Sequence, residues 1–132
     1  MTETITLETK KLLKQLSHFQ LYKVSFVETN WSVNLTFVFD NNTKDIIIEL
    51  FNIIHFTMSK TIDDNDGCYM VGEVTITRVN DGGAKILSSL RYPFKNLDQN
   101  VLYYPSRSLF HLHLEGDLCL DIICGDFTIG QK

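Results

Sequence analysis

Histidines, cysteines and carboxylates gather in the stretch SLFHLHLEGDLCLDIICGD, residues 108–126. His111 and His113 occupy alternate positions of a strand-like pattern. Side chains two residues apart on a strand project the same way, so a His-x-His pair can chelate a divalent metal ion. With Asp121 as a carboxylate, the three side chains match a common ligand set for zinc or non-haem iron. This stretch therefore suggests a metal- or small-ligand-binding face.

A solvated sheet face is the alternative interpretation of the same residues. Binary patterning alone produces a polar face opposite an apolar one. Strand-based sites normally take a further ligand from a distant segment, and the obvious donors elsewhere are His55 and Glu49. No spacing rule ties these two residues to the stretch. Whether the face binds a metal or is only solvated stays open at this point.

The apolar residues of the stretch predict a hairpin with a defined register. They fall at even positions and the polar residues at odd ones, while the Glu-Gly-Asp-Leu segment supplies a chain reversal. A two-residue turn would pair Leu112 with Asp121 and expose half of the apolar residues, because cross-strand partners share a face. A three-residue loop or bulged turn places Leu112 opposite Ile122 and His113 opposite Asp121. We predict this second register.

Periodicity elsewhere predicts one helix followed by strands. Residues 6–18 carry leucines at helical spacing behind the capping residue Thr6. Alternating patterns then predict strands near residues 20–28, 31–39, 45–59 and 68–79. The strand over residues 45–59 is apolar on both faces, which is typical of a covered strand. The N-terminal helix is the expected cover.

Residues 84–107 are the least regular part of the chain. AKILSSL can form a short helix, and both prolines of the chain favour irregular structure around them. The aromatic composition here resembles that of protein interfaces, although tyrosines in loops also cap cores. The candidate partner-binding residues are Tyr92, Phe94, Tyr103, Tyr104 and Arg107.

Composition and charge exclude several classes of function. The chain has 132 residues and a formal net charge of −4, with no basic stripe, so nucleic acid and anionic membranes are not expected partners. An acidic N-terminus without an apolar core is unlike a signal peptide. Three cysteines without CxxC spacing indicate reduced thiols and a cytoplasmic location. No nucleophile elbow, phosphate loop or dinucleotide fingerprint is visible, so we expect a non-enzymatic protein without a cofactor.

Three segments carry a resemblance to a known group of proteins. LSHFQLYKVSF after a short helix, the strand DIIIELFNIIHFTMS and the closing FHLHLEGDLCLDIICGDFTI are similar to small β-rich bacterial immunity proteins of polymorphic-toxin systems and related uncharacterised families. Together these segments cover about a third of the chain. The similarity lies in apolar alternation, and no functional residue is carried over. The resemblance implies a non-enzymatic, acidic, bacterial protein that binds a partner.

These observations together predict an α+β, mainly β, single domain over residues 1–132. Its expected architecture is an antiparallel sheet or small β-sandwich with one N-terminal helix packed on it. The leading functional hypothesis is binding of another protein, or of a second copy as a homodimer. The alternative is a metal- or small-ligand-binding protein that uses His111, His113 and Asp121.

Overall fold

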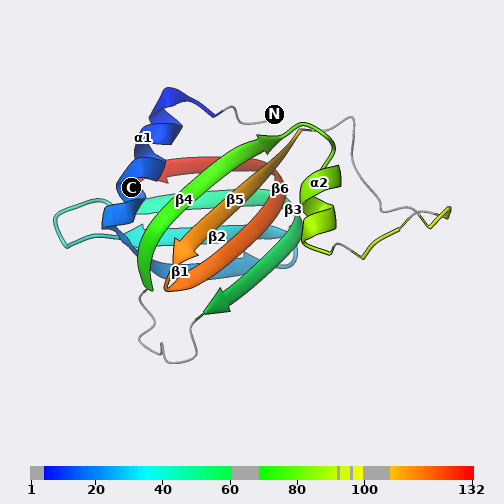
Figure 1. The fold of residues 1–132 in the computed structure, drawn as a ribbon. Helices are drawn as coiled ribbons and strands as arrows, with labels where there is room; N and C mark the ends of the chain where they lie inside the picture. Colours follow the sequence, from blue (N-terminus) through cyan, green and yellow to red (C-terminus); the bar gives the residue numbers. More distant parts are fainter. Residues whose placement is uncertain (1–4, 61–68, 92, 96, 100–107) are drawn as a thin grey trace.

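The structure is a computed structural model that describes residues 5–60, 69–91, 93–95, 97–99 and 108–132. Within these ranges two α-helices, a short 3-10 helix and six β-strands follow one another along the chain (Figure 1). The helices are α1 (Leu7–Gln15), the 3-10 helix η1 (Leu16–His18) and α2 (Ala84–Ser89). The strands are β1 (Gln20–Val27), β2 (Ser32–Val38), β3 (Ile46–Lys60), β4 (Tyr69–Val79), β5 (Leu109–Gly116) and β6 (Leu118–Gln131).

The six strands pair in antiparallel fashion and close into a barrel in the order β1-β2-β3-β6-β5-β4. The mainly β fold and the antiparallel sheet predicted from the sequence are therefore confirmed. The barrel closes where Gln20 pairs with Met70 and Leu21 pairs with Tyr69. The longest strands, β3 and β6, pair with each other from Ile46 to Lys60. Figure 1 shows both of them curving from the back of the barrel to its front.

The paired strands β3 and β6 bend at the same point, so each of them forms part of two sides of the barrel. Cys124 and Phe127 of β6 are both buried although their positions have opposite parity. Between them lies Gly125, where a side chain would come within 3.1 Å of the Cβ of Asn52. Asn52 has a φ of 55°, in the left-handed region that asparagine tolerates better than most residues. The two strands therefore turn together at this point.

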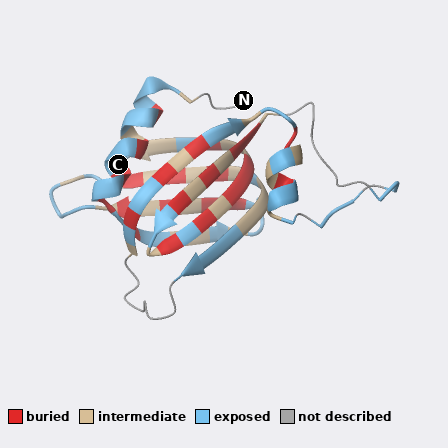
Figure 2. Cartoon of the chain, viewed as in Figure 1, coloured by how far each residue is buried: buried red, intermediate tan, exposed pale blue. Residues whose placement is uncertain are grey.

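The barrel interior is filled by inward-facing residues of all six strands, which alternate with outward-facing ones except at the bend of β3 and β6 and where bulges interrupt β1 and β4 (Figure 2). Phe110 and Phe127 meet edge to face there, with ring centroids 5.0 Å apart. Burying a large apolar side chain contributes about 1.5–3 kcal/mol relative to leaving it exposed. Residues that are wholly buried in this core include Phe37, Ile48, Leu50, Phe110, Leu112, Leu120, Ile122 and Phe127.

Helix α1 begins where the sequence predicts and packs on the main core. The hydroxyl oxygen of Thr6 accepts a hydrogen bond of 3.1 Å from the backbone N–H of Thr9, which caps the helix. Leu13 and Leu16 join the barrel core, next to β4 and β6. The expected place of this helix, over the second face of β3, is wrong.

The outer side of β3 is covered by α2 only in part, at Ile54. Leu87 of α2 packs with Leu109 and Ile123, and Ile54 of β3 lies against this small cluster. The apolar pattern of β3 showed that a second face is covered, but periodicity carries no information on which helix covers it. The short helix expected within residues 84–107 is thus present and covers this part of β3.

The hairpin register predicted for residues 108–126 is confirmed. Leu112 pairs with Ile122, Leu114 with Leu120 and His113 with Asp121. Direct pairing of β5 with β6 ends at Leu114 and Leu120. Beyond it β5 continues to Gly116 beside β4 and β6 begins at Leu118 beside β3, so only Asp117 stands between the two strands. Within the described ranges neither helix has the length and apolar character needed to cross a membrane.

Candidate metal centre

The strand pairing places His111, His113 and Asp121 on the outer surface of the barrel. Leu112 and Ile122 point into the core, so the residues of opposite parity on β5 and β6 point outward. His113 lies directly opposite Asp121, and His111 lies two residues along the same strand. The structure therefore brings together the three residues that the sequence suggested as ligands.

One carboxylate oxygen joins the two histidines. Asp121 Oδ1 lies 2.7 Å from His111 Nε2 and 2.7 Å from His113 Nδ1. The second ring nitrogen of His113, Nε2, lies 2.9 Å from Glu115 Oε1. The three candidate ligand atoms of His111, His113 and Asp121 lie within 4.8 Å of one another. The side chains are partly exposed, which leaves the group accessible from solvent.

Charge interactions within the group shift the pKa values of two members. Hydrogen bonds to Glu115 and Asp121 raise the pKa of His113 above its usual value. Partial burial opposes ionisation of Asp121, but hydrogen bonds from His113 and His111 outweigh it and lower the pKa of the carboxyl. The pair therefore favours a protonated His113 beside an ionised Asp121 when no other cation is bound.

His55 lies beside this group on the neighbouring strand β3. It pairs with Ile123, which in turn pairs with His111, so all three share the outer face. Thr57 is directly opposite Asp121, which makes His55 a diagonal neighbour of that carboxylate. His55 Nε2 is buried and has no hydrogen-bond partner. Burial lowers the pKa of His55, so its imidazole is neutral at pH 7 and Nε2 can act as a ligand.

Glu49, Cys119 and Cys124 stay outside the group. Glu49 pairs with Thr128, towards the other end of the β3–β6 pair from Asp121. Cys119 is exposed and Cys124 is buried. Burial raises the pKa of the Cys124 thiol to about 12, which leaves it protonated and inert.

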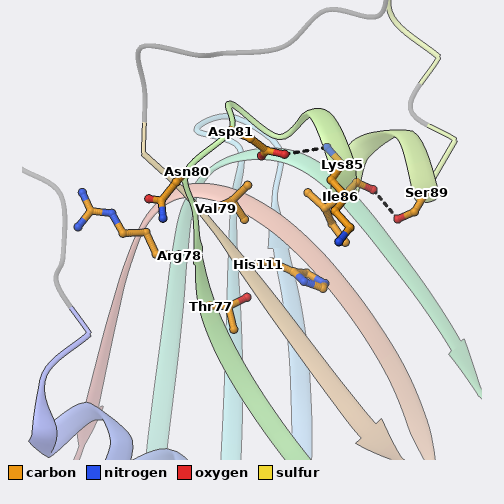
Figure 3. A pocket seen from close by; sticks show the side chains of 9 residues that line it. All are labelled: Thr77, Arg78, Val79, Asn80, Asp81, Lys85, Ile86, Ser89 and His111. Carbon is orange, nitrogen blue, oxygen red and sulfur yellow. Dashed lines mark hydrogen bonds between the residues drawn. The ribbon is translucent and has the colours of Figure 1, made fainter.

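A groove of about 390 Å³ opens beside His111, between α2 and the end of β4 (Figure 3). Thr77 lies opposite His111 on β4, and Ile86 descends towards it from α2. The start of α2 is held by Asp81, whose carboxylate accepts hydrogen bonds of 3.0 Å from the backbone N–H groups of Gly83 and Lys85. The groove gives solvent and small ligands a path to one side of His111.

The candidate partner-binding residues are not tested by the structure. Tyr92, Tyr103, Tyr104 and Arg107 lie outside the described residues. Phe94 lies in a short described segment and is 61% exposed. A partner-binding role for this aromatic segment therefore stays a prediction.

Comparisons with known proteins add no family to this picture. Searches with protein-family models and among curated proteins found no match to the sequence. The functional argument for this chain therefore rests on its own residues.

Proposed function

We propose that this protein binds a divalent transition-metal ion of the zinc class through His111, His113 and Asp121. The observation that supports this function best is the shared Asp121 Oδ1, which lies 2.7 Å from a ring nitrogen of each histidine. Four ligands at the usual zinc distances of about 2.0–2.1 Å stand about 3.4 Å apart in a tetrahedron. To admit an ion, each histidine nitrogen must move from 2.7 Å to about 3.4 Å from Asp121 Oδ1, and the two nitrogens, which lie within 4.8 Å of each other, must take up the same spacing.

Glu115 supplies the outer support that such sites use. When His113 binds a metal through Nδ1, its Nε2–H donates to Glu115 Oε1, at 2.9 Å. A carboxylate in this place fixes the tautomer of a ligating histidine and raises its basicity. The fourth coordination position is open to water, because the three side chains are partly exposed.

Titration of metal-stripped protein with ZnCl₂ tests the proposal. Without a histidine tag, the wild-type chain should bind one zinc ion by calorimetry and melt at a higher temperature when zinc is added. At a free zinc concentration 100 times Kd the gain is about 2.7 kcal/mol, because only the folded chain holds the site. The double variant His111→Ala/His113→Ala should lose both effects.

His18→Ala is the matched control, because it removes an exposed histidine at the end of η1. It should bind zinc like the wild type. Equal zinc affinity in the double variant and the control would sink the proposal. So would a wild-type chain that takes up neither zinc nor another divalent transition metal.

A second proposal is that the protein binds another protein, as the leading sequence hypothesis states. Exposed aromatic side chains such as Trp31 and Phe26, 59% and 43% exposed, support it. A groove between α1 and β4 supports it more specifically. The narrower expectation of an immunity-like role in the bacterial cytoplasm stays a prediction.

A further inference from the structure

A groove of about 590 Å³ lies between α1 and β4. On the strand side it is lined by every residue from Gly72 to Thr77. On the helix side it is lined by Lys10, Leu13 and Lys14. Figure 1 shows α1 standing beside β4 at the side of the barrel. A helix and one edge of a strand thus face each other across a channel.

The edge of β4 that faces this groove has no strand partner among the described residues. β5 pairs with β4 from Val71 to Val79 along its other edge. β1 pairs with β4 only at Tyr69 and Met70. An unpaired edge presents backbone N–H and C=O groups in the pattern that an additional strand can bind.

The floor of the groove is apolar. Leu13 of α1 and Val74 and Ile76 of β4 are nearly buried, at 9%, 5% and 6% exposure. Val74 and Ile76 are two residues apart and therefore share a face of the strand. This floor suits the apolar side chains on one face of an added strand.

The helix side of the groove is basic. Lys10 and Lys14 are exposed and four residues apart, so they project from the same face of α1. Their spacing along the helix axis is about 6 Å. Alternate side chains of a strand are about 6.7 Å apart, which is close to this spacing. Glu73 is the acidic residue of the lining and stands on the strand side.

We propose that this groove binds an extended, acidic segment of a partner protein as an additional strand on β4. The backbone of the segment pairs with the edge from Gly72 to Thr77, its apolar side chains meet the floor, and its carboxylates face Lys10 and Lys14. The inference rests on the protein-binding proposal and is independent of the metal site.

A designed peptide tests the groove. The probe is a blocked decapeptide of alternating valine and glutamate, added to the ¹⁵N-labelled full chain. We expect shifted amide signals from Gly72 to Thr77 and slower hydrogen exchange of those amides that face the groove. The double variant Lys10→Glu/Lys14→Glu should bind roughly tenfold more weakly, because two exposed attractive pairs become repulsive.

Lys23→Glu/Lys85→Glu is the matched control, since it makes the same change in net charge at two exposed lysines on other elements, β1 and α2, outside the groove lining. At about 0.15 M salt charges beyond about 8 Å are screened, so this variant should keep nearly the wild-type affinity. Equal losses in the two variants, or equal binding of a valine–lysine peptide, would overturn the inference. If the peptide shifts amide signals only on other surfaces, the groove is not its binding site, although the protein-binding proposal is unaffected. If it shifts no signal, both the groove inference and the protein-binding proposal lose support.

Discussion

At the scale of single residues, Asp121 organises the histidine group, which consists of His111, His113 and Asp121 with Glu115 beside them. Its Oδ1 accepts from both imidazoles, and Glu115 holds the far side of His113. The sequence predicted that His113 and Asp121 face each other, because parity fixes which residues pair. It did not predict the role of Glu115 or the position of His55, because ring orientation and the bulge at Ile53–His55 depend on packing rather than on pattern.

Glu115→Gln tests the outer support of the site. Loss of the carboxylate should weaken zinc binding about tenfold at a pH near 8, because the ligating ring of His113 becomes less basic. The same change should lower the pKa of His113 towards its ordinary value, because the hydrogen bond to Glu115 is the largest cause of its upward shift. Calorimetry measures the affinity, and the imidazole signals of an NMR titration measure the pKa.

Glu28→Gln is the control for this variant, since it removes an exposed carboxylate in the turn that follows β1. It should change neither the zinc affinity nor the titration of His113. If both variants bind zinc equally well, Glu115 does not support the site.

At the scale of elements, the turn between β5 and β6 is shaped by its neighbours. Residues 115 and 116 pair with β4, while 118 and 119 pair with β3, so the two ends of the turn are drawn apart. Asp117 binds Met70 of β4 twice, through its backbone N–H to the Met70 carbonyl and through its carboxylate to the Met70 N–H, both at 3.0 Å. Local pattern predicted the register but not this separation of the strand ends, because it depends on pairing with strands distant in sequence.

Gly116→Ala tests this close approach. A Cβ at Gly116 would collide with the backbone carbonyl oxygen of Met70 and lie 3.0 Å from the Gly72 nitrogen. Backbone atoms cannot rotate away, so we expect a loss of about 1–3 kcal/mol in the free energy of unfolding. Urea denaturation measures it. Gly130→Ala is the control, because a Cβ there meets nothing within 4 Å, and it should change stability by less than about 0.5 kcal/mol. If Gly116→Ala and Gly130→Ala have the same urea midpoint of unfolding, the close approach at Gly116 is contradicted.

At the scale of the whole molecule, the sheet was predictable but its closure was not. Alternating patterns located the strands, because each buries one face. Closure depends on two residue pairs between β1 and β4, which no local pattern encodes. The position of α1 was predicted wrongly for the same kind of reason: its leucines required a core, and both the barrel and the outer face of β3 offered one.

The histidine group also predicts how the stability of the whole fold depends on pH. The pKa of His113 is raised above 6.5, so its contribution is complete below that value and is lost as pH rises through the higher folded pKa. The pKa of Asp121 is lowered below 3.8, so its contribution is complete above that value and is lost as pH falls through the lower folded pKa. Both contributions are present together between these two ordinary values. The group should therefore stabilise the fold most in mildly acidic solution.

Urea denaturation of metal-free wild type and Asp121→Asn, from about pH 3 to about pH 9, measures this dependence. The unfolding free energy of the variant is subtracted from that of the wild type at each pH, which removes the contributions of groups that titrate alike in both chains. The difference in unfolding free energy should be largest between pH 3.8 and 6.5 and decline on either side, since His113 is neutral at high pH and Asp121 is protonated at low pH. A difference that stays constant over this range would show that the group contributes no charge interaction to folding.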